Sequence, residues 1–196
     1  MPANPQRKAE SRRRILEEAG RLFRRHGYEG VGIDAIMQAA GLTRGAFYAH
    51  FPSKRDLFAE VIGGEHGFNR LMKARTGGSD KELLTEAIGI VGDYLHPDHR
   101  AEVGLGCIMA ALSADVGRAD AATRRAYAAR VRELVEEFGR GLRAPESDLD
   151  PRALAAMVMS VGALIMVRAM DDEDLARRTL AACRKEAERL LKSKPA

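Results

Sequence analysis

The sequence predicts an all-α protein of about nine helices. Apolar residues recur at three- and four-residue spacing through most of the chain, and no stretch alternates with the two-residue period of a strand. Glycine, proline and serine separate the periodic stretches, as expected at helix ends. The 45% of hydrophobic residues is enough for a sizeable core, and this composition argues against disorder over most of the length.

The first helices are short and closely spaced. An amphipathic stripe between residues 15 and 23 predicts a first helix. The next three are expected at residues 33–40, 44–50 and 53–75. Gly27 and Gly41 are expected to end the first two helices, and Thr43 and Ser53 can cap the two that follow.

The remaining sequence predicts a larger helical region. Its helices are expected at residues 83–95, 105–116, 120–142 and 153–170, with a last one that ends near residue 191. Breaks are expected at residues 76–79, 144–147 and 171–174. We therefore expect a three-helix domain at residues 1–52 and a second domain at residues 53–196.

Positive charge is concentrated at the N-terminal end. The net charge is +4, but residues 1–55 hold 11 Lys and Arg against 5 Asp and Glu, whereas the rest holds 21 against 23. A basic segment on a near-neutral body is typical of nucleic-acid binding. No apolar run approaches the roughly 20 residues of a membrane span, and the basic N-terminus is no secretory signal, so we expect a cytoplasmic protein.

The most informative segment runs from residue 33 to residue 54 and reads IDAIMQAAGLTRGAFYAHFPSK. Two short helices joined by residues 40–43 have the proportions of a helix-turn-helix, whose second helix enters the major groove of DNA. Gly41 permits the tight left-handed turn, and Leu42 can pack beneath it. The alternative is an ordinary helical hairpin with a few polar surface groups.

The second helix of this segment has side chains suited to reading DNA. Arg44 can donate two hydrogen bonds to a guanine, and the small Gly45 and Ala46 let the backbone approach base edges. Other side chains offer donors for phosphate oxygens. These are Thr43, Tyr48, His50 and Lys54. Phe47 and Phe51 are expected to anchor the helix to the core.

Residues 40–54, AGLTRGAFYAHFPSK, closely resemble the DNA-binding signature of the TetR family of transcriptional regulators, and the resemblance extends over about residues 9–62. It implies that the four phosphate donors contact the DNA backbone and that Arg44, Gly45 and Ala46 face bases. Gly32 stands where this family commonly has Ser or Thr. Glycine can cap the helix, but it supplies no hydroxyl for a phosphate contact.

A basic tail precedes or opens the first helix, and two interpretations of it are open. It could reach phosphate or the minor groove, or it could be a solvated, frayed end. Its residues are Arg7, Lys8, Arg12, Arg13 and Arg14.

A module of this size reads few base pairs, so two copies on a dimer are needed to read a pseudo-palindrome. The helix at 153–170 is apolar nearly all round and must be buried from more than one side. We expect it to form a dimer surface with the last helix, as the resemblance also implies; the alternative is a central core helix in a monomer. The expected contact residues are Leu154, Val158, Val161, Leu164, Ile165 and Leu180.

By the same resemblance, the middle of the chain holds a pocket for a small effector. Methionine and aromatic side chains suit an adaptable apolar ligand, although plain core packing is the alternative for each of them. The candidates are Phe68, Tyr94, Cys107, Met109, Tyr127, Phe138, Met157 and Met166. Cys107 could also react with an oxidant or electrophile, or be an inert buried thiol.

Motifs for other functions are few. With only Cys107 and Cys183, no disulfide framework or zinc-finger spacing exists. The cluster at residues 93–99, with Asp93, His96, Asp98 and His99, could bind a divalent metal, but it reads better as a polar helix end, and no metal site is predicted. No H-E-x-x-H, G-x-S-x-G or phosphate-binding glycine loop is present, so neither an enzyme nor a cofactor is predicted.

Taken together, these features predict a homodimeric repressor that binds a palindromic double-stranded DNA operator. A small, largely apolar effector is expected to release it, and the resemblance implies that the helix at 53–75 is the lever. Two alternatives stay open: an activator, and a DNA-binding protein that is architectural or controlled by a protein partner instead of a ligand.

Overall fold

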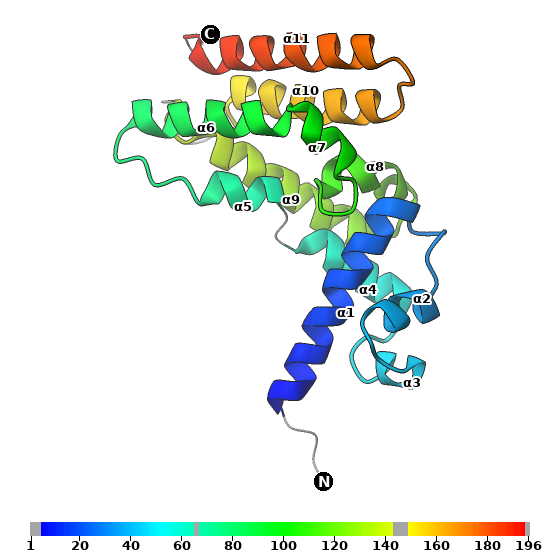
Figure 1. Ribbon diagram of the computed structural model, residues 1–196. Helices are drawn as coiled ribbons and strands as arrows, with labels where there is room; N and C mark the ends of the chain where they lie inside the picture. The colour runs from blue at the N-terminus through cyan, green and yellow to red at the C-terminus, as the bar shows by residue number, and fades with distance from the viewer. Residues whose placement is uncertain (1–4, 65–66, 143–148, 195–196) are drawn as a thin grey trace. The chain divides into compact units, whose positions relative to one another are not determined.

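A computed structural model describes residues 5–64, 67–142 and 149–194, and these residues form eleven helices and no strand (Figure 1). The predicted all-α class is therefore confirmed. The chain divides into two compact units. An N-terminal unit contains Met1–Gly64 with Ala111–Tyr127, and a C-terminal unit contains Glu65–Ala110 with Ala128–Ala196. The break expected at residues 144–147 lies outside the described residues.

Four helices form most of the N-terminal unit: α1 (Pro5–His26), α2 (Ile33–Ala39), α3 (Arg44–Phe47) and α4 (Lys54–Gly63). Both α2 and α4 pack on α1, and α3 packs on α2. The apolar stripe of α1 supplies the centre of this core, where Phe23 meets Phe58 of α4 edge to face at 5.3 Å. The other large buried side chains are Ile15, Ile36, Met37, Phe47, Phe51, Leu57 and Ile62.

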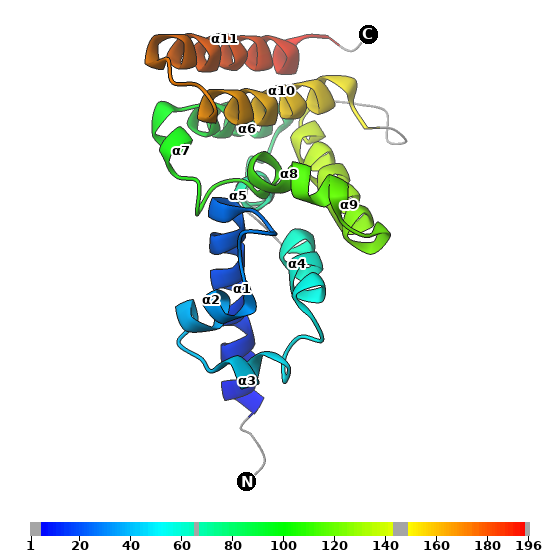
Figure 2. The same cartoon turned by 90° about the vertical axis from the view of Figure 1, so that its right-hand side faces the viewer.

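The C-terminal unit contains the later helices, α5 (Gly67–Lys73), α6 (Asp80–Tyr94), α7 (Pro97–Ala101), α10 (Pro151–Arg168) and α11 (Glu173–Lys192). Two further helices, α8 (Ile108–Arg118) and α9 (Ala121–Gly139), run from one unit into the other. α10 and α11 lie side by side as a helical hairpin, and α11 also contacts α6 (Figure 2).

Several helix ends follow the predicted chemistry. Gly27 ends α1 with a φ of 72°, a left-handed conformation that glycine adopts at no steric cost. Ser53 caps α4 because its hydroxyl accepts a hydrogen bond from the Asp56 amide at 3.2 Å. Asp150 and Asp172 cap α10 and α11 in the same way.

Two predicted boundaries are wrong. The single helix expected at residues 53–75 is two helices, because α4 ends at Gly63 and the extended backbone of Gly64 (φ −72°, ψ 167°) cannot continue it. The short helix α7 was also not expected, and these two changes raise the count from nine to eleven. The helix expected at 44–50 is regular only to Phe47.

The apolar helix α10 is partly buried in the C-terminal unit. Its 18 residues have a mean hydropathy of 1.4, so by length and composition it could cross a membrane. Its packing against α11 explains that composition in another way. Leu164 and Val167 are fully buried in this unit, and the Ser160 hydroxyl donates to the Ala156 carbonyl within the helix.

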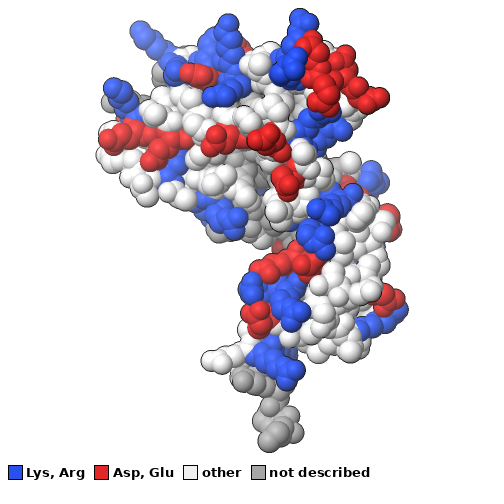
Figure 3. Space-filling model, in the orientation of Figure 1, with Lys and Arg blue, Asp and Glu red and all other residues white. Residues whose placement is uncertain are grey.

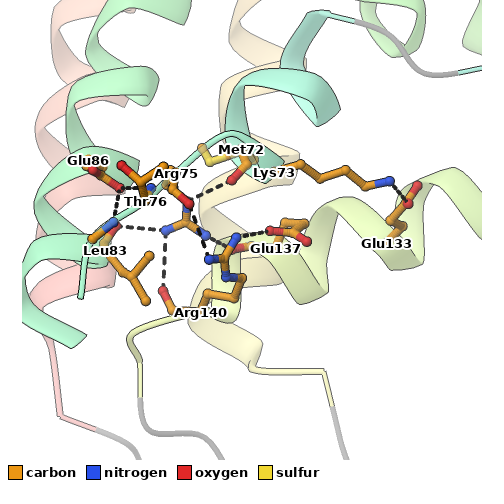
Figure 4. Close-up of polar contacts among 10 residues, drawn as sticks. Met72, Lys73, Arg75, Thr76, Leu83, Glu86, Glu133, Glu137 and Arg140 are labelled. Atoms are coloured by element: carbon orange, nitrogen blue, oxygen red, sulfur yellow. Dashed lines mark hydrogen bonds and ion pairs between the residues drawn. The ribbon is translucent and has the colours of Figure 1, made fainter. Parts of the chain in front are cut away.

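One buried arginine ties three helices of the C-terminal unit together (Figure 4). Arg75, only 5% exposed, donates from Nε to the Met72 carbonyl at 3.0 Å and from Nη1 to the Leu83 carbonyl at 2.8 Å. The same guanidinium also bonds the Glu137 and Arg140 carbonyls at the end of α9. Burial lowers the pKa of Arg75, but arginine stays charged at any ordinary pH.

Replacing Arg75 with Ala should lower the free energy of unfolding by about 3 kcal/mol, because carbonyls from α5, α6 and α9 lose a buried partner. Chemical denaturation followed by circular dichroism measures this change. Arg70→Ala, which truncates an exposed arginine on α5, is the matched control and should change stability little. Equal stability of the two variants would show that Arg75 does not hold these helices.

Candidate nucleic-acid interface

The turn between α2 and α3 is closed by main-chain hydrogen bonds. The Gly41 amide donates to the Gln38 carbonyl at 3.0 Å, and the Leu42 amide donates to the Met37 carbonyl at 2.9 Å. Gly41 has a φ of 65°, as its sequence context predicts. These bonds and this left-handed residue close a tight turn between the end of α2 and the start of α3.

An arginine from α1 fixes the same turn. The Arg14 guanidinium donates to the Ala40 carbonyl. A Cβ at position 41 would lie only 2.7 Å from Arg14 Nη2, so a side chain there would displace the Arg14 guanidinium, while the positive φ favours glycine on its own. The angle between α2 and α3 therefore depends on a contact that the motif itself does not contain.

The expected anchors of α3 lie in the core. Phe47 and Phe51 are buried, with ring centroids 5.8 Å apart, and the Arg12 guanidinium lies 4.8 Å from the centre of the Phe51 ring. Tyr48 packs edge to face on Phe47 but is 59% exposed. The core side chains thus hold α3 with its opposite face in solvent.

That solvent face carries the residues expected to meet DNA. Thr43, Arg44 and Gly45 are exposed. Thr43 occupies the N-cap position of α3, but its hydroxyl does not make the predicted capping bond and so is available to a phosphate. A Cβ at Gly45 would meet no atom of the chain within 4 Å. Packing within the protein does not require glycine here, which agrees with close approach of an outside partner.

Arg44 makes an ion pair that the sequence analysis missed. Its Nη1 lies 2.5 Å from Oδ2 of Asp34, the second residue of α2, and both side chains are more than 60% exposed. The two residues are ten positions apart and lie in different helices, so helical periodicity does not predict the pair. Only the folded turn, which brings the Arg44 side chain to Asp34 at the start of α2, reveals it.

Lys54 is partly engaged in contacts within the N-terminal unit. Its ammonium donates to the Tyr28 carbonyl at 2.8 Å and to the Val31 carbonyl at 3.0 Å, and it lies 4.0 Å from the centre of the Tyr28 ring. Two of its three N–H groups therefore hold the loop before α2 against the start of α4. One donor is left for a phosphate, and that role of Lys54 stays a prediction.

His50 follows α3, where the ring is partly buried. Its Nδ1 is buried and has no hydrogen-bond partner among the residues that the structure describes. Burial lowers the pKa of His50, and the positive charges of Lys8 and Arg12 lower it further. The ring is therefore neutral at pH 7, and its contact with phosphate would be a hydrogen bond without a full charge.

The basic tail is helical, because α1 begins at Pro5. Acidic and basic side chains are interspersed along α1 (Figure 3). Arg13 pairs with Glu10 and Glu17 on the same helix, while Arg12 pairs with Glu60 of α4. Arg7 and Lys8 are exposed near the start of the helix and are the tail's remaining candidates for DNA contact.

Acidic residues at the α8–α9 corner contact the other side of the N-terminal unit. Asp115 accepts a hydrogen bond from the Tyr28 amide at 3.3 Å, and Asp120 lies 3.7 Å from Arg55. A cavity of about 220 Å³ lies between these groups. Nothing in the local sequence could have indicated a contact across 87 residues.

Most of the predicted effector residues lie in the core of the C-terminal unit. Phe68 stacks on Tyr94 with ring centroids 4.0 Å apart and meets Phe138 edge to face at 5.2 Å. Cys107, Met109 and Met157 are also buried. Tyr127 differs because it belongs to the N-terminal unit, where its hydroxyl bonds Ser113, and Met166 differs because it is 58% exposed.

The predicted dimer residues fall into two groups. Leu164 and Leu180 are buried inside the chain, and Val161 nearly so. The exposed group is Leu154, Val158 and Ile165. Only this second group has appreciable surface that a partner could cover.

The polar residues around position 96 lie at helix ends, and His96 serves as a helix cap. His96 Nδ1 accepts a hydrogen bond from the Asp98 amide at 3.3 Å and so caps α7. His99 Nδ1 lies 2.8 Å from the Tyr94 carbonyl. In residues 5–64, 67–142 and 149–194, no three His, Cys, Asp or Glu side chains gather in a way that could hold a metal ion.

The turn, the anchored α3 and its exposed polar face define a helix-turn-helix module of the DNA-binding type. Residues 15–61 match the family model described as bacterial regulatory proteins, tetR family. The predicted resemblance to the TetR family is therefore confirmed over this region.

Curated relatives match over the same region. The chain is 48% identical over 52 residues to the HTH-type transcriptional regulator AcrR of Shigella flexneri, which covers 26% of this chain and 24% of that protein. It is 48% identical over 48 residues to the HTH-type transcriptional repressor AcnR of Corynebacterium glutamicum, which covers 24% of this chain and 26% of that protein. The chain thus matches about a quarter of the length of these relatives.

Solved structures extend the similarity of fold to nearly the whole chain. A TetR transcriptional regulator from Chloroflexus aurantiacus superposes with a TM-score of 0.74 at 21% identity, covering 96% of this chain and 98% of that one. Escherichia coli NemR in its reduced form gives a TM-score of 0.70 at 16% identity, covering 95% and 97%. These structures support the helical architecture of both units.

The depressed pKa of His50 predicts a pH-dependent stability. The unfolded chain binds a proton at this ring more readily than the folded chain does, so the free energy of unfolding should fall as the pH is lowered through about 6.5. His50→Gln should remove the contribution of this ring, so its free energy of unfolding should fall less between pH 7.5 and pH 5.5 than that of the wild type. Chemical denaturation at both pH values measures the difference. His26→Gln, at an exposed histidine of the same unit, should behave like the wild type.

Proposed function

We propose that this protein is a transcriptional regulator that binds double-stranded DNA through α3. The observation that carries the proposal is the exposed face of α3, on which Thr43, Arg44 and Gly45 lie in solvent while Phe47 and Phe51 hold the helix from beneath. Arg44 and the backbone at Gly45 and Ala46 would face bases. Thr43, Tyr48, His50 and the remaining donor of Lys54 would meet phosphates.

The proposed mode of action is repression. Relatives at the DNA-binding region include the repressor AcnR of Corynebacterium glutamicum. A module held across promoter DNA represses by occluding the site, which requires no catalytic group and no cofactor. The proposed location is the cytoplasm, where the DNA is.

The proposed assembly is a homodimer formed through α10 and α11. Leu154, Val158 and Ile165 recur on α10 at spacings of four and seven residues, so they form one exposed apolar face. Met166 on α10 and Leu175 on α11 add exposed apolar surface. A two-fold partner that covered this face would present two recognition helices to a pseudo-palindromic operator.

The proposed signal is a small, largely apolar effector held in the C-terminal unit. The contacting rings of Phe68, Tyr94 and Phe138, with buried Met109 and Met157, offer adaptable apolar surface. Because these side chains pack closely, an effector would have to part them. The effector would bind more tightly to a dimer whose recognition helices no longer match the operator than to the DNA-binding dimer. This difference in affinity would shift the population away from the DNA-binding state.

Selection of bound sequences from a random duplex library tests DNA recognition directly. The wild type should enrich a pseudo-palindrome. Arg44→Ala should weaken binding to that sequence by about 1–3 kcal/mol and relax the preference at one base pair in each half-site. Arg25→Ala, which removes one exposed positive charge from the last turn of α1, should leave the base preference intact. An unchanged preference in Arg44→Ala would exclude Arg44 as a base reader.

Val158→Asp should dissociate the dimer, because the two-fold axis would bury two carboxylates in an apolar interface. We expect the dimer dissociation constant to rise about a hundredfold, equivalent to roughly 3 kcal/mol. Analytical ultracentrifugation measures this constant. Leu71→Asp makes a similar change at an exposed residue of α5, 53% exposed against 56% for Val158, and should leave the dimer intact. A dimer that survives Val158→Asp would place the interface elsewhere.

A further inference from the structure

The ion pair between Asp34 and Arg44 contributes little to folding. Both side chains are more than 60% exposed, and an exposed pair contributes about 0–1 kcal/mol to stability. The turn that separates them is already fixed by Gly41, by the Arg14 contact and by main-chain hydrogen bonds. The stability of the module therefore does not depend on this pair.

The contact leaves Arg44 able to read a base while it is held. Asp34 accepts from Nη1, so the Nε–Nη2 edge of the guanidinium keeps two parallel N–H groups. That edge matches the O6 and N7 acceptors of guanine. A side chain that is already held in one rotamer loses less conformational entropy when it binds.

The same carboxylate carries a cost that does not depend on sequence. Asp34 lies in the first turn of α2, beside the residues proposed to face DNA, and its negative charge opposes approach to phosphates. This repulsion lowers the affinity for every duplex. The oriented Arg44 raises the affinity only for duplexes that have guanine at the contacted position. Repulsion of duplexes that lack this guanine, together with an Arg44 oriented toward duplexes that have it, raises selectivity.

We propose that Asp34 is a specificity-determining positioning residue, which orients Arg44 for guanine, while its negative charge weakens binding to every duplex. This inference rests on the proposed DNA-binding function. Asp34 does not itself touch the base. It acts through Arg44, so removing Asp34 should have no effect on selectivity once Arg44 is absent.

The test compares the dissociation constants for the duplex selected by the wild type and for the same duplex with the contacted G·C pair changed to A·T. Asp34→Ala should bind the changed duplex more tightly. The ratio of the dissociation constant for the changed duplex to that for the selected duplex should fall roughly tenfold. Asp34→Asn, which keeps the shape and loses the charge, should lower the ratio less. Glu29→Gln removes one exposed negative charge elsewhere in the unit and should leave the ratio unchanged.

The double variant Asp34→Ala/Arg44→Ala separates positioning from plain charge removal. In the Arg44→Ala background, the Asp34 substitution should tighten both duplexes equally and leave the ratio as it was. A ratio that stays constant or rises in Asp34→Ala alone overturns the inference while leaving the proposed function standing. A wild type that prefers no sequence overturns both.

Discussion

Unsatisfied main-chain carbonyls at helix ends are the constraint on which this structure depends most. Each helix leaves its last carbonyls without an intrahelical partner, and a chain of many short helices has many such ends. Here basic side chains meet that need repeatedly. Arg14 bonds the carbonyl that opens the α2–α3 turn, Lys54 bonds two carbonyls before α2, and Arg75 bonds the ends of α5 and α9.

Arginine–carbonyl hydrogen bonds also join α7 and α10, with one arginine from each helix. Arg100 of α7 donates to the Val167 and Met170 carbonyls at 2.8 Å each, at the end of α10. Arg168 of α10 donates to the His99 and Arg100 carbonyls at the end of α7. A long cationic side chain can reach a carbonyl on a neighbouring helix and so fix both elements, which a glycine or serine cap cannot do.

The sequence predicted those features that depend on residues close to each other in the chain. The stripe of α1, the left-handed Gly41, the Ser53 cap and the burial of Phe47 and Phe51 all follow from nearest neighbours in sequence. The Gly64 break escaped notice because glycine is tolerated in many helices. The Arg14, Asp34 and Asp115 contacts could not be found, since each depends on how separate helices pack. Periodicity also could not divide α10, apolar all round, into its inward Leu164 and its outward Val158.

The internal pairing of cations in the N-terminal unit has a consequence for how affinity varies with ionic strength. A protein gains DNA affinity by displacing counterions only with charges that are free to neutralise phosphates. Much of the basic charge in residues 1–55 is already engaged with carboxylates or carbonyls, as at Arg12, Arg13 and Lys54. On the proposed function, counterion release is therefore smaller than the eleven basic residues suggest, and shape and base contacts carry more of the recognition.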